Sequence, residues 1–96
     1  MRRNLHPTEG ARFLFERTAD EGPRARYRAQ IYTPTELFEA AAILGEDGSV
    51  ELPPTGASAE LDERLATMAR LIARDAAKRR ADGLGAWPER VLRWRK

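Results

Sequence analysis

The sequence has no cysteine and a single histidine, His6, among its 96 residues. Without cysteine the chain forms no disulfide, no thiolate metal site and no thiol nucleophile. One histidine near the start of the chain leaves little for acid–base catalysis, and no pair of acidic residues has a spacing that indicates one catalytic site. We therefore expect no catalytic residues, no metal and no cofactor, and we predict that the protein is not an enzyme.

Long apolar runs are also missing. No segment approaches the roughly 20 apolar residues of a membrane-spanning helix, so we expect no membrane span and a cytoplasmic location. The chain is 42% apolar and 33% charged, which is typical of one small globular domain. We assign that domain to residues 11–96. Residues 1–10 have no hydrophobic period, and we expect them to form a disordered leader.

The formal net charge is only +2, but its distribution along the chain is uneven. Residues 1–69 contain eight basic and twelve acidic residues, whereas residues 70–96 contain nine basic and three acidic residues. The basic character therefore belongs to the C-terminal quarter. A polyanion would be attracted there rather than to the chain as a whole.

Residues 57–82 are the longest regular stretch. Leu61, Leu65, Met68 and Ile72 fall on one stripe of a helical wheel, which predicts one long amphipathic helix. Ser58 is a suitable N-cap, and glycines follow the predicted end. Asp75 and Arg79 continue the apolar stripe. This indicates that the helix either extends past the sheet or turns these two residues toward a partner.

Two stretches alternate with the period of a strand. In residues 11–18, Phe13 and Phe15 share one face, and in residues 24–32 Ala25, Tyr27, Ala29 and Ile31 do so. Residues 20–23 form a turn signal between them. The first two strands are therefore predicted to form a hairpin.

Residues 33–44 have two interpretations. Thr33 and Glu36 form a capping box, with Pro34 at the first helical position and Gly45 as a stop, which indicates a helix. The same stretch alternates around Phe38 and Leu44 and leads into a hairpin-type loop, which indicates a strand. We favour the strand, because a meander under one covering helix buries the apolar stripe more simply.

The predicted fold is α+β. A three- to four-stranded antiparallel meander is covered on one face by the long C-terminal helix, and a short helical segment follows in residues 87–96, where Trp87, Val91 and Trp94 share one side.

Three groups of side chains are candidates for binding. On the outer sheet face, alternation aligns three arginines whose alternative role is to pair with acids on neighbouring strands. The helix carries a basic row spaced by four residues, which can also be a solvated face near the helix C-terminus. The terminal segment interleaves tryptophan with arginine, and its tryptophans can alternatively dock on the core. The candidate residues are Arg24, Arg26, Arg28, Tyr32, Arg70, Arg74, Lys78, Trp87, Arg93 and Trp94.

These features favour a non-enzymatic protein-interaction module, whose partner is another protein or a second copy of this chain. The alternative is nucleic-acid or polyanion binding through the basic C-terminal quarter, which we do not favour.

Overall fold

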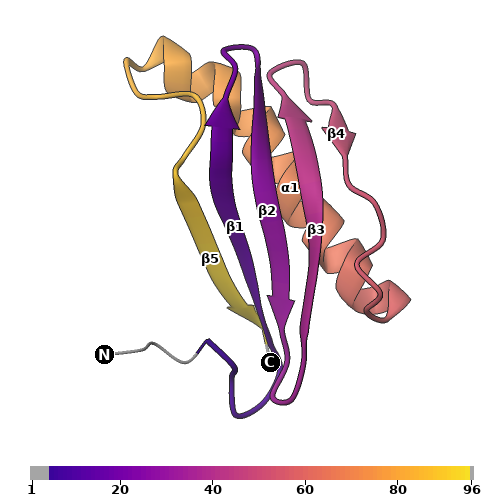
Figure 1. The fold of residues 1–96 in the computed structure, drawn as a ribbon. Coiled ribbons are helices and arrows are strands. Elements are labelled where there is room, and N and C mark those ends of the chain that lie inside the picture. Colours follow the sequence, from indigo (N-terminus) through magenta and orange to yellow (C-terminus); the bar gives the residue numbers. More distant parts are fainter. Residues whose placement is uncertain (1–4, 96) are drawn as a thin grey trace.

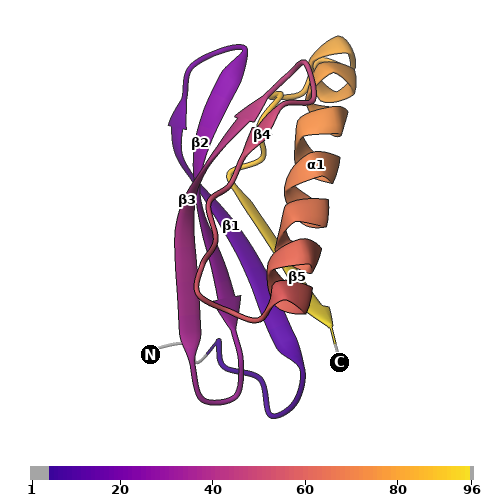
Figure 2. The same cartoon turned by 90° about the vertical axis from the view of Figure 1, so that its right-hand side faces the viewer.

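The computed structural model describes residues 5–95. Its elements follow one another as β1 (Ala11–Asp20), β2 (Arg24–Tyr32), β3 (Leu37–Gly45), β4 (Val50–Glu51), α1 (Ala59–Ala81) and β5 (Arg90–Arg95). The strands form one antiparallel sheet in the order β4-β3-β2-β1-β5 (Figure 1). Helix α1 lies on one face of the sheet (Figure 2).

The predicted α+β class is confirmed, but two details of the predicted fold are wrong. The sheet has five strands instead of three or four. The segment after the long helix contains no second helix within the described residues, and its end is strand β5. The meander of β1 to β4 is therefore completed by a strand that returns beside β1, at the opposite edge from β4.

The core lies between the sheet and α1. Phe13 pairs with Ile31 and Phe15 with Ala29 across β1 and β2, so the alternation of both strands points the same residues toward the helix. Small residues on β2 and β3 let the helix approach closely. The fully buried large side chains of this core are Trp87, Tyr27, Phe13, Phe15, Ile31, Leu44 and Leu65. Leu14 is also fully buried, but it lies on the other face of β1, opposite Gln30 and Leu92.

The ambiguous stretch of residues 33–44 contains strand β3, as favoured. The backbone N–H of Thr33 donates to the carbonyl of Glu36 (2.9 Å), and the N–H of Glu36 donates to Oγ1 of Thr33 (3.0 Å). The residues that look like a capping box therefore close the turn between β2 and β3. A threonine side chain can bond a nearby N–H in either setting.

Helix α1 begins as its sequence predicts. Oγ of Ser58 accepts a hydrogen bond from the N–H of Leu61 (3.2 Å), which satisfies one of the free amides at the helix start. Its buried face carries Leu65 and Ile72 among three alanines. After the helix, Gly83 has φ of 80°, a conformation that favours glycine, and the chain turns back toward the sheet.

Trp87 fixes the path from α1 into β5. Its side chain is 1% exposed, and Nε1 donates to the carbonyl of Gly22 (2.9 Å). The hydroxyl of Tyr27 donates to the carbonyl of Pro88 (2.6 Å). These two hydrogen bonds hold residues 87 and 88 next to the β1–β2 turn. The chain that follows therefore begins β5 beside the edge of β1.

The start of the described chain contacts the far end of the sheet. Nδ1 of His6 lies 2.7 Å from the carbonyl oxygen of Thr33, and its ring packs edge-on against Tyr32. Pro7 is buried. Residues 1–4 of the predicted leader lie outside the described residues.

Candidate functional site

The two edges of the sheet differ in length. Strand β4 has two residues and continues into Pro53 and Pro54, which have no N–H to offer. Strand β5 has six residues, and no other strand of the described chain pairs with its outer side. The β5 edge is therefore the one that another chain could extend.

The ladder between β1 and β5 determines which β5 groups are free. The N–H of Arg17 donates to the carbonyl of Glu89 (2.9 Å), in register with the pairs Phe15–Val91 and Phe13–Arg93. In an antiparallel ladder such hydrogen-bonded pairs occur at every second residue. The backbone groups of Arg90, Leu92 and Trp94 therefore point away from β1, toward the open edge.

A groove runs beside this edge, between β5 and α1. It consists of hollows of about 430, 320 and 230 Å³. The first two share Met68 and Leu71, and the second and third share Arg64 and Arg95. We call this the α1–β5 groove. Its helix side is formed by Glu60, Leu61, Glu63, Arg64, Thr67, Met68, Leu71, Ile72, Asp75 and Arg79, and its strand side by Arg90, Val91, Leu92, Arg93 and Arg95.

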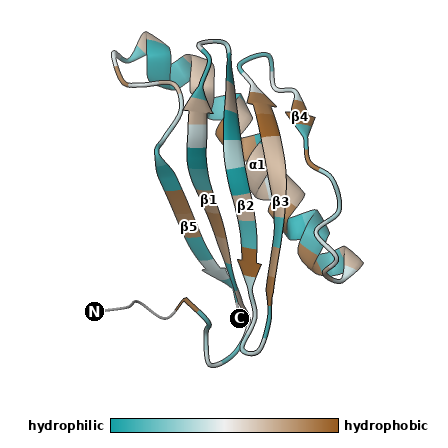
Figure 3. Cartoon of the chain, in the orientation of Figure 1, coloured by the Kyte–Doolittle hydropathy of each residue, from teal (hydrophilic) through white to brown (hydrophobic). Residues whose placement is uncertain are grey.

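The groove exists because α1 crosses the sheet obliquely (Figure 1) and packs mainly against β2, β3 and β4. The flank of the helix that faces β5 is left partly uncovered. Leu71 is 43% exposed there, and Met68 is half-buried. Figure 3 shows a hydrophobic stretch in the middle of β5, where Val91 and Leu92 lie. The groove therefore has an apolar floor of Met68, Leu71, Ile72 and Val91 next to backbone groups of β5 that pair with no other described strand.

The strand side of the groove is basic. No ion pair involves Arg90, Arg93 or Arg95 in residues 5–95. On the helix side, Arg64 is paired with Glu60 (3.2 Å) and Glu63 with Arg70 (3.1 Å). The helix charges thus largely compensate one another, whereas the β5 arginines have no acidic partner within ion-pair distance among residues 5–95. Nη1 of Arg93 instead donates to the carbonyl of Leu92 (2.9 Å).

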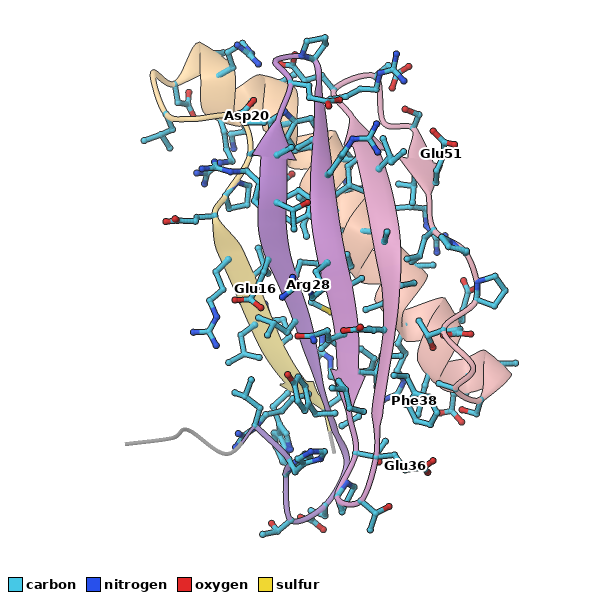
Figure 4. The ribbon with its side chains drawn as sticks, viewed as in Figure 1. Glu16, Asp20, Arg28, Glu36, Phe38 and Glu51 are labelled. Atoms are coloured by element: carbon cyan, nitrogen blue, oxygen red, sulfur yellow. The ribbon has the colours of Figure 1, made fainter. Side chains whose placement is uncertain are left out.

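The outer sheet face, on the side away from α1, is open over β2. Arg24, Arg26 and Arg28 are exposed, and Arg26 is paired with Glu21 (3.2 Å). Arg28 lies opposite Glu16 in the ladder, and Figure 4 shows these two side chains on neighbouring strands of this face. This surface is therefore partly compensated by its own acids.

Tyr32 closes the other end of the same face. Its hydroxyl donates to Oε1 of Gln30 (3.2 Å), and Nε2 of Gln30 donates to Oε2 of Glu39 (3.0 Å). Burial, followed by the nearby carboxylates of Glu16 and Glu39, raises the pKa of Tyr32. These bonds give Tyr32 a structural role at the end of the sheet.

The remaining predicted residues are dispersed. Arg70 bonds Glu63 and Thr67, while Arg74 and Lys78 are exposed on the solvent side of α1. Trp87 is buried. Arg93 and Trp94 lie together on β5, where the Trp94 side chain is 49% exposed and its Nε1 donates to the carbonyl of Glu9 (3.1 Å).

Sequence reasoning did not identify the groove. It did not select Leu71 or Arg90, it considered Arg95 only for polyanion binding, and it placed Val91 on a helical face, because these residues become neighbours only when β5 forms. One signal was present: Asp75 and Arg79 are charged residues that fall in line with the apolar stripe beyond Ile72, and both line the groove.

Within the described residues, no three histidine, cysteine or acidic residues are grouped so that they could hold a metal ion, and no helix is long and apolar enough to cross a membrane. Comparisons with models of protein families, with curated protein sequences and with solved structures found no match for this chain.

Proposed function

We propose that this protein is a non-enzymatic protein-binding module that receives an extended segment of a partner along β5. The segment would add a sixth strand to the sheet and lay alternate side chains into the α1–β5 groove. The observation that carries this proposal is the free, six-residue edge of β5 bordering an apolar groove.

Strand addition uses two kinds of contact, and the β5 edge offers both. Main-chain hydrogen bonds provide affinity, and pockets for alternate side chains provide specificity. Arg90, Leu92 and Trp94 supply outward backbone donors and acceptors, and Met68 and Leu71 supply the apolar surface. The Arg93 guanidinium, which bonds the Leu92 carbonyl in the free protein, would have to release it to the added strand. A strand at this edge would remove both from water.

An added strand would also use the outer sheet face. Successive side chains of a strand point to opposite faces. The Leu92 and Trp94 side chains are on the opposite face of β5 from those of Val91 and Arg93. Partner side chains that point away from the groove would lie beside Leu92 and Trp94. The exposed Trp94 side chain would then contribute a large contact area at the rim of the site.

The test begins with random linear peptides, displayed and selected on the immobilised wild-type protein. Binding of the selected peptides is then measured with Leu92→Pro, which removes an outward N–H and leaves the ladder to β1 intact. We expect about a tenfold loss of affinity, because one hydrogen bond in this setting is worth roughly 1.4 kcal/mol.

Leu92→Ala is the matched control, since it shortens the same side chain and keeps the N–H; its affinity should stay within about threefold of wild type. Arg90→Pro with Arg90→Gln provides a second pair if Leu92→Pro fails to fold. Selection that yields no peptide, or peptides bound equally by the proline and control variants, would refute strand addition.

Nucleic-acid binding is the second candidate, and it is favoured because Arg90, Arg93 and Arg95 form no ion pair in the part of the chain that the structure describes. Nucleic-acid binding predicts that the protein binds a single-stranded oligonucleotide with an affinity that falls steeply as the salt concentration rises. Unlike a peptide, an oligonucleotide cannot continue the β ladder, so the Leu92→Pro and Leu92→Ala variants should bind it equally.

A further inference from the structure

The charges on β5 define what a partner segment should carry, provided that the proposed strand addition is correct. In the ladder, Arg93 lies opposite Phe13 and Arg95 opposite Ala11, so both arginines are on the groove side with no acid on β1 across from them. Arg90 differs, because Glu16 lies opposite it on the outer face. The β5 arginines without an opposite acid on β1 are therefore Arg93 and Arg95, two residues apart. The acids of α1 that line the groove with them are Glu60, Glu63 and Asp75; the first two pair with Arg64 and Arg70, and none pairs with Arg93 or Arg95 within residues 5–95.

The same register places an apolar position next to these charges. Val91 is on the groove side, two residues before Arg93, and lines the hollow that also contains Met68, Leu71 and Ile72. Directly opposite residues of paired strands have neighbouring side chains. A partner residue across from Val91 would meet this apolar floor, and residues across from Arg93 and Arg95 would meet guanidinium groups.

We infer that the ligand of the α1–β5 groove is an acidic extended peptide with an apolar residue followed, at every second position, by two acidic residues on the same face. The order along the partner depends on its direction: it is apolar-x-acid-x-acid in a parallel strand and the reverse in an antiparallel one. The intervening residues face the outer side of the sheet.

A second copy of this chain fits the edge less well than an acidic segment. It would bring its own three β5 arginines to the same pair of strands, and like charges on adjacent strands are unfavourable. A nucleic acid would satisfy the arginines, but it would leave the outward backbone groups of β5 and the apolar floor without matching partners.

The test uses three synthetic peptides of about nine residues, in each strand direction. The first has the alternating order of one valine and two aspartates separated by threonines. The second has the same composition with both aspartates moved by one position, and the third has asparagine in place of aspartate. Affinities are measured by calorimetry for the wild type, Arg93→Gln, Arg95→Gln and the double variant.

The first peptide should bind the wild type about tenfold more tightly than the other two, with about threefold lost for each arginine removed, as expected for partly exposed ion pairs. The double variant should bind all three peptides alike. Arg74→Gln is the matched control, because it removes the same charge from the solvent side of α1 and should keep the full preference.

Two failures can be distinguished. If Leu92→Pro weakens all three peptides but they bind the wild type equally, strand addition stands and the acidic pattern is wrong. If Leu92→Pro weakens none of them, the proposed function fails and the pattern with it. Displacement of the acidic peptide by an oligonucleotide would show that the ligand is a polyanion. Formation of a dimer that blocks the peptides would show that it is a second copy of the chain.

Discussion

The two edges of the sheet are closed in different ways. At the β4 edge the strand is short, Pro53 and Pro54 follow it, and α1 packs against it. At the β5 edge six residues lie with their outer side unpaired, and the helix stands back from them. The comparison shows that prolines and the helix cover the β4 edge, whereas the β5 edge is flanked by the side chains of its arginines.

Charge at an open edge has two consequences. Charged side chains discourage the edge-to-edge pairing that causes aggregation. They also select for a partner of opposite charge. In the proposed strand addition, the arginines of β5 would keep the edge free of other copies and available to an acidic segment.

The largest expected effect concerns the residue that holds β5 in place. Trp87→Ala should lower the free energy of unfolding by about 3–5 kcal/mol, because a fully buried indole is lost and a cavity remains. Trp94→Ala, at a half-exposed site on the same segment, should cost about 1 kcal/mol or less. Urea unfolding measures both, and equal losses would mean that Trp87 does not anchor the open edge.

The two flanks of α1 provide the next contrast. Leu65→Ala should cost about 2–5 kcal/mol, because its side chain is fully buried in the core. Leu71→Ala, on the flank that faces β5, should change stability by about 0.5 kcal/mol or less and should weaken binding of peptides selected on the wild type. A large loss of stability from Leu71→Ala would show that the groove is closed in solution.

Tyr27, which contacts the segment before β5, should make the free energy of unfolding depend on pH. Burial raises the pKa of Tyr27 to about 12, so its phenol ionises at lower pH in the unfolded chain than in the folded one. The free energy of unfolding should fall between about pH 10 and 12, as ionisation favours the unfolded state.

Tyr27→Phe should remove much of this fall and, at neutral pH, cost about 1 kcal/mol for the lost bond to Pro88. Denaturation at several pH values, together with phenolate absorbance, measures both effects. An unchanged pH profile in Tyr27→Phe would contradict a buried, neutral phenol.

The smallest effect belongs to the β4 side. Arg80 and Glu46 form an ion pair of 2.7 Å that links α1 to the loop before β4, with both side chains partly exposed. Glu46→Gln should cost about 0.2–1 kcal/mol and less at high salt. Glu51→Gln, an exposed residue of β4 with no ion pair in the described chain, should be neutral by comparison.

Much of the layer structure was predictable from local patterns. The alternation in residues 24–32 and the helical wheel of α1 each predict one apolar face, and in the structure these two faces pack together in the core. Residues 90–95 were not predictable, because their sequence suits both periods. As a helix, Val91 and Trp94 fall on one side with Trp87; as a strand, Val91 and Trp94 fall on opposite faces. The free edge of β1 decides between them, and no local signal reports that edge.

The site was harder to predict than the fold for the same reason. Arg93 and Trp94 were identified as candidates from the interleaving of tryptophan with arginine in an expected helical segment, but their role depends on β5 being an edge strand. The arginines of β2 and α1 were predicted by spacing, which does not reveal that Arg26 and Arg70 have acidic partners.

Residue-resolved amide hydrogen exchange of the free protein, and of the protein saturated with a selected peptide, tests the central claim most directly. In the free protein the amides of Arg90, Leu92 and Trp94 should exchange rapidly, and those of Val91 and Arg93 slowly. With peptide bound, all five should be protected. Uniform protection along β5 in the free protein, or rapid exchange at Leu92 that persists in the complex, would contradict an open edge that receives a strand.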